Sequence, residues 1–319
     1  MRVLVTGGAG FIGSHLVDAL LHKGHQVAVL DDLSSGRREQ VPAGAEFFEM
    51  DIRDAAGVAQ VMNEFRPDAV SHQAAQMSVS RSVRDPGFDA EVNIVGLVNV
   101  CFAAASAGSK KIVFASSGGV LYGEAIEPAS EETPAHPQSP YGISKWAGEQ
   151  YLQFFQRQFG LSAIALRYAN VYGPRQNPHG EAGVVAIFYT RLLNGESALI
   201  NGDGKYVRDY VHVSDVVRAN LLAMEANLPG FEAINVGTGM GTDVNQLATS
   251  IRRHCLMIAE REHFSVTIPE LNHGPARAGD LRSNLVANAK AATFLGWKPQ
   301  IELDAGLRST AEWFARERR

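Results

Sequence analysis

Tyr141 and Lys145 are the side chains in this sequence whose types and spacing best suit acid–base chemistry. They lie four apart in the segment 139–145 (SPYGISK), where serine followed by proline is typical of a helix start. Residues four apart share a helix face, and an ammonium beside a phenol favours the phenolate. Lowering a tyrosine pKa from about 10 to near 7 takes roughly 4 kcal/mol. Such a base can deprotonate a hydroxyl as hydride leaves the same carbon. Taken alone, the pattern is more often that of a solvated helix face.

A glycine-rich turn near the N-terminus predicts a dinucleotide site. Gly7, Gly10 and Gly13 follow an apolar strand-like run directly and open a helical pattern. Glycines allow a tight turn and close approach of the backbone to a pyrophosphate, and the helix N-terminus offers free N–H groups. Isolated, the pattern also fits a purely structural turn, so its place between strand and helix carries the prediction.

A pair of carboxylates after the second strand-like run favours NAD over NADP. Asp31 and Asp32 follow Gly13 by 18 and 19 residues. A carboxylate at this distance from the glycine turn accepts hydrogen bonds from the adenosine ribose hydroxyls. The same charge would repel a 2′-phosphate. Arg37 and Arg38 argue the other way, but they lie beyond the turn.

The elements that must position these residues alternate between strand and helix through the first half. We expect strands near 3–5, 27–30, 47–48, 69–70, 112–114 and 163–166, and helices near 12–23, 55–65, 88–107 and 141–158. This alternation predicts an α/β fold, a doubly wound parallel Rossmann sheet. After residue 166 the strands shorten and Gly, Pro and Asn become frequent. We therefore expect an NAD-binding Rossmann domain over 1–167, plus segments near 207–235, and a smaller α+β substrate-binding lobe over 168–319.

Composition narrows the function classes further. The charge of −5 disfavours nucleic acid and membrane surfaces as partners. Cys101 and Cys255 make no disulfide framework, no Cys/His cluster has metal-ligand spacing, and a cytoplasmic location is expected. The N-terminal MRVLVTGG does not resemble a signal peptide. No apolar run is expected to span a bilayer.

Several segments in register resemble one family, the UDP-glucose (UDP-galactose) 4-epimerase branch of the extended short-chain dehydrogenases/reductases. The segments are TGGAGFIGSH at the start, DLSSG after Asp31, HQAAQMSVSRSV at 72–83, PYGISK at 140–145, LRYANVYGPRQ at 166–176, VRDYVHVSDV at 207–216 and RAGD at 277–280. The resemblance implies NAD-dependent inversion at C4 of a UDP-hexose through a 4-keto intermediate.

The resemblance also implies roles for single residues. Asp51 and Ile52 would lie against the adenine, Asn93 would brace the catalytic helix, and Tyr168 would orient the nicotinamide. Together with the glycine turn, the resemblance predicts the set of residues that would contact the cofactor. They are Gly7, Gly10, Phe11, Ile12, Gly13, Asp31, Asp32, Asp51, Ile52, Gln73, Ala74, Ala75, Asn93, Tyr141, Lys145 and Tyr168.

For the UDP-sugar, the resemblance implies a second group of residues. Asn170 would approach the diphosphate, Arg208 and Arg277 would bind its phosphates, and Asp280 would hold a ribose hydroxyl. Planar guanidinium groups match phosphate oxygens well. Without the family match, each arginine would be interpreted as part of a surface ion pair.

The catalytic hydroxyl is the point where the sequence departs from the family. The family places it four residues before a tyrosine, but here that position is Gly118, before Tyr122. We expect Ser117 in this role, with Ser116 as the alternative. The competing structural interpretation is that such a serine only satisfies backbone groups at the end of the strand. Related dehydratases carry Asp-Glu just after the hydroxyl, whereas Gly118 and Gly119 cannot move protons. Dehydration is therefore not expected.

Three rival functions remain open from the sequence. The nearest alternatives are UDP-N-acetylglucosamine and UDP-glucuronate 4-epimerases. The resemblance implies that Asn284 lies where a residue limits the size of the sugar pocket, and because asparagine is smaller than tyrosine, we expect room for N-acetylated sugars. Another nucleotide-sugar oxidoreductase would release NADH at each turnover. A non-catalytic NAD-binding module on the same fold is the third, although Tyr141, Lys145 and Ser117 argue against it.

The resemblance further implies a homodimer that pairs through the helices near 88–107 and 141–158. The apolar stretch from Val98 to Ala105 suits such burial. Packing against the protein's own sheet explains the same stretch equally well.

Overall fold

The chain folds around one large parallel sheet, and the structure, a computed structural model, describes residues 1–178, 183–276 and 280–318. Seven strands are ordered β10-β6-β5-β4-β1-β2-β3, and every neighbouring pair is parallel. Their bounds are β1 (Arg2–Thr6), β2 (Gln26–Asp31), β3 (Glu46–Glu49), β4 (Ala69–His72), β5 (Lys111–Ser117), β6 (Ser162–Tyr168) and β10 (Phe231–Val236).

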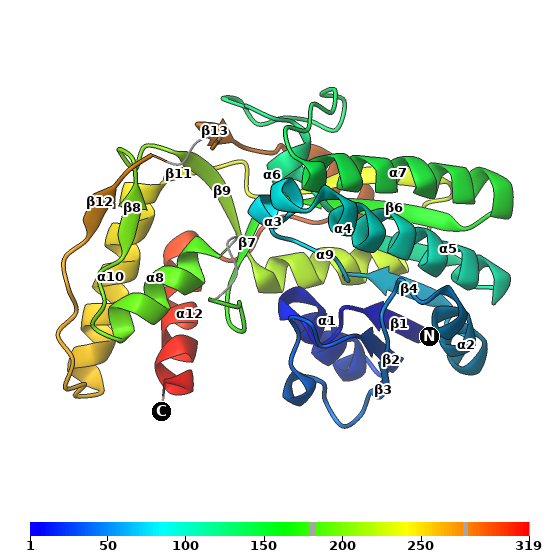
Figure 1. Cartoon of the computed structure of the whole chain (residues 1–319), viewed down its shortest axis with the longest axis horizontal. Coiled ribbons are helices and arrows are strands. Elements are labelled where there is room, and N and C mark those ends of the chain that lie inside the picture. The colour runs from blue at the N-terminus through cyan, green and yellow to red at the C-terminus, as the bar shows by residue number, and fades with distance from the viewer. Residues whose placement is uncertain (179–182, 277–279, 319) are drawn as a thin grey trace.

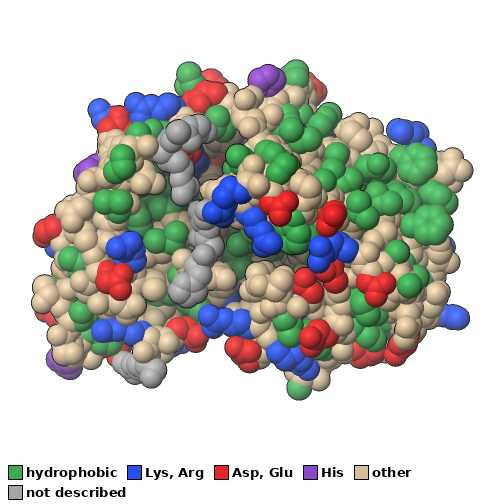
Figure 2. Space-filling view, viewed as in Figure 1, with side chains coloured by type: hydrophobic (Ala, Val, Ile, Leu, Met, Phe, Trp, Pro, Cys, Tyr) green, Lys and Arg blue, Asp and Glu red, His purple; other side chains and the backbone are tan. Residues whose placement is uncertain are grey.

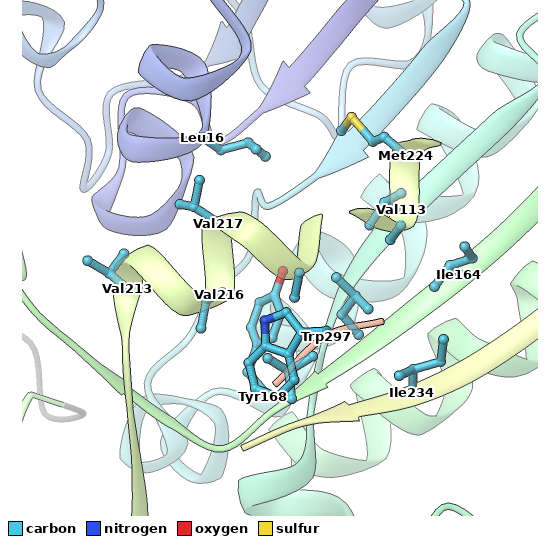
Figure 3. Packing of buried hydrophobic residues seen from close by; sticks show 14 of the residues in the cluster. Leu16, Val113, Ile164, Tyr168, Val213, Val216, Val217, Met224, Ile234 and Trp297 are labelled. Atoms are coloured by element: carbon cyan, nitrogen blue, oxygen red, sulfur yellow. The ribbon is translucent and has the colours of Figure 1, made fainter. Parts of the chain in front are cut away.

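Helices cover both faces of this sheet because its strands are apolar on both sides. One face carries α2 (Ala55–Phe65), α5 (Gly96–Ser106) and α7 (Pro140–Phe159); the other carries α1 (Phe11–His22), α9 (Val213–Glu225) and α11 (Ala289–Leu295). In β1, Val3 and Val5 join the core on the α1 and α9 side, while Leu4 joins the core under α2 and α5. Figure 3 shows part of the first of these cores. The doubly wound α/β prediction is confirmed.

The remaining helices and strands form a second part of the molecule, seen on the left of Figure 1. Helices α8 (Val184–Leu193), α10 (Val244–Arg261) and α12 (Leu303–Glu317) enclose their own apolar core. Two small sheets complete it: β7 (Asn170–Tyr172), β9 (Val207–His212), β11 (Gly241–Asp243) and β13 (Ser283–Asn284) form one, and β8 (Leu199–Asn201) with β12 (Asn272–Gly274) forms the other. We call this part the C-terminal lobe.

The segments near 207–235 divide between the two parts. Strand β10 completes the large sheet and α9 covers it, whereas β9 pairs with β7, β11 and β13 in the lobe. The chain therefore crosses from lobe to sheet within this region.

The helix predicted near 88–107 is not regular. It consists of α4 (Pro86–Ala90), a π-helical turn (Glu91–Val95) and α5, with α3 (Val79–Arg84) before it. Two further short helices are η1 (Arg38–Gln40) and α6 (Gly118–Leu121). A π-turn inserts one residue into the helical repeat and is frequent at functional sites.

The same helical run corrects one expectation about membranes. Contrary to the sequence-based expectation, Pro86–Ser106 is long and apolar enough to span a bilayer, with a mean hydropathy of 1.4. One such helix is weak evidence for a span. This one packs against α2 and α7 and places Leu97 and Val100 in the core, as the central helix of a globular domain does.

The order of the strands determines where a ligand can bind. The chain proceeds from β1 outward to β2 and β3, then returns to β4 and proceeds outward the other way. In doubly wound sheets, the crevice at such a reversal, outside the carboxyl ends of the strands, is the usual binding site. Here that crevice lies between β1 and β4, beside the glycine turn.

Candidate active site

The glycine turn connects β1 to α1 at the reversal point of the sheet. Gly7 has a φ of +68°, and a Cβ there would lie 2.6 Å from the Ala74 nitrogen. A Cβ on Gly13 would lie 2.1 Å from the Gly7 carbonyl oxygen, whereas one on Gly10, the residue before α1, would meet only that oxygen, at 3.2 Å. The turn thus needs glycine to close and leaves the amides at the start of α1 open, which fits a pyrophosphate.

Asp31 and Asp32 lie at the end of β2, beside this turn. The Asp31 carboxylate is nearly buried and accepts hydrogen bonds from the Ala9 and Leu33 amides, each at 2.9 Å. Burial raises the pKa of Asp31. Asp32 accepts from the amide and hydroxyl of Ser34. Because a carboxylate has about four acceptor positions, Asp31 retains capacity for ribose hydroxyls.

The predicted adenine contacts lie after β3. Arg53 Nε donates to Asp51 Oδ1 at 3.1 Å and Arg53 Nη2 to Oδ2 at 2.6 Å, and these hydrogen bonds lower the pKa of Asp51. Ile52 is buried and lies so close to Gly96 that a Cβ there would be 2.6 Å from its Cδ1. Both residues thus lie just beyond the carboxyl end of β3, and their contact with the adenine remains a prediction.

Gln73, Ala74 and Ala75 follow β4, on the other side of the crevice. The Gln73 amide nitrogen donates to Asn220 Oδ1 at 3.0 Å, and Asn220 Nδ2 donates to the Tyr168 hydroxyl at 2.8 Å. The Tyr168 hydroxyl is buried, and burial raises its pKa to about 12. Tyr168 belongs to the same core cluster as Trp297, and Figure 3 labels both. The predicted contact of Tyr168 with the nicotinamide remains a prediction.

Tyr141 and Lys145 lie on the first turns of α7, whose start the sequence specifies. Ser139 caps the helix by accepting from the Gly142 amide at 3.2 Å, and Pro140 occupies the first turn. The Lys145 ammonium lies 5.7 Å from the centre of the Tyr141 ring and 4.8 Å from that of Phe114 on β5. The structure therefore brings the predicted pair together.

The electrostatics of this pair differ from the expectation of a lowered phenol pKa. Burial lowers the pKa of Lys145 to about 8, while burial and then the charge of Asp89 raise the pKa of Tyr141. The expectation considered only the ammonium. It omitted desolvation of the phenol and a buried carboxylate nearby, and both favour the neutral phenol.

The two adjacent serines at the end of β5 have different environments. Ser116 is 2% exposed and donates to Glu149 Oε1 at 2.6 Å. Ser117 precedes α6 and is partly exposed, and its hydroxyl makes no hydrogen bond within the described residues. Helices α6 and α7 approach closely, since a Cβ on Gly142 would lie 3.0 Å from the Val120 carbonyl oxygen. Of the two serines, Ser117 thus has the free hydroxyl, at the start of the helix that packs against α7.

The glycines after Ser117 have distinct roles. A Cβ on Gly118 would lie 2.6 Å from Val286, so this glycine allows close packing. A Cβ on Gly119 would meet nothing nearer than the Ser117 hydroxyl, at 3.7 Å. These two positions offer no acid or base beside Ser117.

The predicted substrate residues gather on the small sheet of the lobe. Arg208 on β9 lies opposite Asn284 on β13, and Asn170 on β7 donates to the Asp209 carbonyl oxygen at 3.2 Å. Asn284 is buried and donates to the Gly123 carbonyl oxygen at 3.1 Å. Arg208 and Asp280 form an ion pair at 2.5 Å. Arg277 lies outside the described residues. Figure 2 shows Lys and Arg side chains around a hollow between lobe and sheet.

Asn93 is buried in the π-turn and contacts the loop after β4. Its amide accepts from the Gln76 nitrogen and donates to the Gln76 carbonyl oxygen, both at 2.9 Å. It also donates to Asp89. Asn93 therefore links this loop to the helix before α5.

Sequence reasoning missed the buried charged residues around the site. Asp89 accepts from Ser144 of α7, and Glu149 of α7 pairs with Arg167 of β6 at 2.6 Å. Glu149 follows Lys145 by four residues, so an acid on the buried stripe of α7 was the available signal. Among the described residues, no group of three or more His, Cys, Asp or Glu side chains could hold a metal ion.

Known proteins share both the sequence pattern and the fold of this chain. The model of the NAD dependent epimerase/dehydratase family matches residues 3–237. A UDP-glucose 4-epimerase of Mycolicibacterium smegmatis is 47% identical over 98% of each chain. The structure of the Thermotoga maritima UDP-glucose 4-epimerase with UDP-glucose matches with a TM-score of 0.92 and 48% identity over 100% of both chains. The Thermus thermophilus UDP-glucose 4-epimerase in complex with NAD matches with a TM-score of 0.91 and 45% identity, covering 98% of this chain and 99% of that one.

Proposed function

The chain belongs to the NAD-dependent epimerase/dehydratase family, and from this premise we propose that it inverts C4 of a UDP-hexose, interconverting UDP-glucose and UDP-galactose. Its relatives at 45–48% identity along nearly the whole chain are UDP-glucose 4-epimerases. The observation that carries the proposal is the juxtaposition of Lys145 with Tyr141 on α7, next to Ser117 and the NAD crevice.

The glycine turn and Asp31 fit NAD, as the close approach at Gly7 and Gly13 indicates. The amides at the start of α1 would hold the pyrophosphate, and Asp31 would hold the adenosine ribose. Lys145 would bind the nicotinamide ribose. NAD, when bound, supplies the hydride acceptor and a positive nicotinamide charge that favours the Tyr141 phenolate.

The residues of this chain perform the proton chemistry. Tyr141 takes the proton of the sugar 4-hydroxyl as the C4 hydride departs, and Ser117 donates to that oxygen as it becomes a carbonyl. The 4-keto sugar then turns over in the site, and hydride returns to its opposite face. Tyr141 returns the proton to the oxygen, so configuration inverts and the cofactor ends unchanged.

We propose that the sheet domain holds NAD and the C-terminal lobe holds the UDP. Arg208 would bind phosphate oxygens and Asp280 a uridine ribose hydroxyl, with Asn170 near the diphosphate and Arg277 as a second phosphate ligand. Binding energy placed on the UDP holds the substrate while the hexose rotates. The hexose itself then needs few strong contacts with the protein.

The direct test is incubation of the purified protein with UDP-galactose and no added NAD, followed by separation of the products. We expect UDP-glucose without accumulation of free NADH. A parallel incubation with added NAD tests the alternative, because an ordinary dehydrogenase needs one NAD for each NADH that it releases. Steady formation of NADH there would indicate such a dehydrogenase, and the absence of UDP-glucose both with and without added NAD would contradict the proposal.

A second candidate substrate class follows from Asn284. Its side chain is short and turned toward the Gly123 carbonyl oxygen, which favours room for an N-acetyl or carboxylate substituent on the sugar. UDP-N-acetylglucosamine and UDP-glucuronate should therefore be assayed separately against UDP-glucose. A higher kcat/KM for either would make it the better substrate.

We also propose a homodimer that works in the cytoplasm, in a step of galactose metabolism. Two buried free thiols, Cys101 and Cys255, suit a reducing compartment. In the predicted stretch 98–105, Val100, Cys101, Ala103 and Ala104 pack against the protein's own core, but Phe102 is 57% exposed. Phe102 belongs to an aromatic patch with Phe154 and Phe159 of α7, and the dimer proposal rests on that patch.

A further inference from the structure

A buried carboxylate, Asp89, lies beneath the proposed catalytic helix with no assigned role. It belongs to α4 and is 0% exposed. Three side chains donate to it: Gln76 Nε2 at 2.8 Å and Asn93 Nδ2 at 3.0 Å to Oδ1, and Ser144 Oγ at 2.6 Å to Oδ2. A buried charge is costly unless it is hydrogen-bonded and paired, so this arrangement calls for a reason.

The three donors come from the elements that form the site. Gln76 follows the cofactor loop 73–75, Asn93 lies in the π-turn, and Ser144 directly precedes Lys145 on α7. Asn93 also exchanges two hydrogen bonds with the backbone of Gln76. One carboxylate therefore connects the cofactor loop, the π-turn and the catalytic helix.

Building on the proposed function, we propose that Asp89 is a positioning residue of this site. Its carboxylate ties the catalytic helix to the cofactor loop, and its negative charge acts on both Lys145 and Tyr141.

The charge, beyond the hydrogen bonds, is what makes an aspartate useful at this position. An asparagine would satisfy the same donors. Burial lowers the pKa of Lys145, and the Asp89 charge offsets part of that decrease. The same charge raises the pKa of Tyr141. It thus keeps the buried Lys145 protonated over a wider pH range, at the expense of the phenolate.

The other charged groups near α7 are engaged elsewhere. Glu149 is paired with Arg167, and Glu91 with Arg53. On α3 and α4, Arg81 stacks on Phe88, Arg84 has a partner, and Asp85 is exposed at the start of α4. On the sheet, Lys111 donates to backbone carbonyls at the end of α9, Glu232 pairs with Lys290, and His72, whose pKa burial lowers to about 3, is neutral. Asp89 is the described acid whose charge reaches both catalytic groups.

Asp89→Asn separates charge from hydrogen bonding. Its amide oxygen still accepts from Gln76 and Asn93, and its NH₂ donates to Ser144 once that hydroxyl turns. Loss of the charge should lower the pKa of both Tyr141 and Lys145. We expect the acid and alkaline limbs of the kcat profile to move together toward lower pH, each by on the order of one unit. A merely structural role would lower the plateau and leave both limbs in place.

A second measurement needs no turnover. The protein is labelled with ¹³Cε-lysine, and the NMR signal of Lys145 is identified as the one that is lost in Lys145→Arg. The midpoint of its pH titration should fall by on the order of one pH unit in Asp89→Asn. Asp85→Asn is the matched control. Asp85 is an exposed carboxylate that caps α4, so water and salt screen its charge and no shift is expected.

The outcomes separate the inference from the proposed function. If Asp89→Asn changes neither the titration midpoint of Lys145 nor the two limbs of the kcat–pH profile, the role of Asp89 is overturned, even in an active epimerase. A shifted midpoint in a protein that does not epimerise UDP-sugars would support it and reject the function. If Asp89→Asn does not fold, Ser144→Ala keeps the charge and cuts the tie to α7. A positioning role predicts that kcat falls about tenfold while KM and the melting temperature stay unchanged. An unchanged kcat, or a fall in kcat that is accompanied by a lower melting temperature, would count against the inference.

Discussion

At the scale of single residues, the two neighbouring serines at the end of β5 fit different roles, one structural and one chemical. Ser116 is buried and donates to Glu149, whereas the Ser117 hydroxyl is free beside α6. A strand places successive side chains on opposite sides, so adjacent serines meet different surroundings. The burial of Ser116 therefore supports Ser117 as the hydroxyl that contacts the sugar oxygen.

Alanine at each serine should give opposite results. Ser117→Ala removes a donor to the developing carbonyl oxygen and should lower kcat by roughly 10²-fold, with an unchanged melting temperature. Ser116→Ala deprives buried Glu149 of a donor and should lower the free energy of unfolding by about 1–3 kcal/mol. Steady-state kinetics and urea unfolding of both variants test this. Equal kinetic losses would show that the serines share the role.

Tyr141→Phe removes the proposed base and little else. The Tyr141 hydroxyl makes no hydrogen bond within the described residues, and the ring stays beside Lys145. We expect kcat to fall by roughly 10²–10⁴-fold, while the protein still carries NAD after purification. The cofactor is measured by its absorbance after the protein is denatured. Full activity in this variant would assign the proton transfer to another group.

The residues that sequence reasoning identified at this scale are those whose signals are local. The glycine turn and the Tyr141–Lys145 spacing lie within single short segments. Asp89 escaped notice because its partner Ser144 is 55 residues away in the chain. The raised pKa of Tyr141 was missed for a related reason, since burial depends on the packing of several elements.

At the scale of elements, α7 serves both chemistry and stability. Tyr141, Lys145 and Glu149 recur at intervals of four, so they share one face of the helix. Glu149 accepts from Arg167 Nε at 2.9 Å and from Arg167 Nη2 at 2.6 Å, and Arg167 Nη1 donates to the Tyr122 hydroxyl at 2.7 Å. The pair joins α7 to β6 and to the end of α6, beside the serines.

Breaking this pair should destabilise the whole fold. Arg167 and Glu149 side chains are only 5% and 0% exposed, so Arg167→Leu leaves a buried carboxylate without its cation. We expect the free energy of unfolding to fall by about 3–5 kcal/mol, measured by urea denaturation. Arg53→Leu, which breaks a partly exposed pair with Asp51, should cost less than about 1 kcal/mol. Similar losses in the two variants would contradict a special role for the α7–β6 pair.

The elements were predictable to different degrees. All six strands expected from sequence are present as β1–β6, because buried parallel strands show as continuous apolar runs. The π-turn at 91–95 was not predicted, since its apolar residues recur much as they do in an α-helix. The lobe strands of two or three residues are too short to show any periodicity, and their pairing depends on contacts distant in sequence.

At the scale of the whole molecule, an aromatic surface on α5 and α7 is left uncovered by the residues that the structure describes. Phe102 of α5 and Phe154 and Phe159 of α7 are 57%, 45% and 46% exposed. The ring centres of Phe102 and Phe154 each lie about 6 Å from that of Phe159 (6.0 and 6.1 Å). In Figure 2, hydrophobic side chains gather over the outer ends of α5 and α7. A contiguous aromatic patch of this kind marks an interaction surface.

A charge placed in this patch should separate the proposed dimer. In a two-fold pair each patch meets its own copy, so Phe154→Asp would bury two carboxylates against aromatic rings. We expect light scattering to show the mass falling from two chains to one, with the fold retained because the ring is exposed in the single chain. Met257→Asp is the control, at an exposed apolar residue of α10. It adds the same negative charge at a site away from the patch, so it should leave the dimer intact. A wild-type protein that is already monomeric at micromolar concentration would reject the dimer, while a dimer that survives Phe154→Asp would place the interface elsewhere.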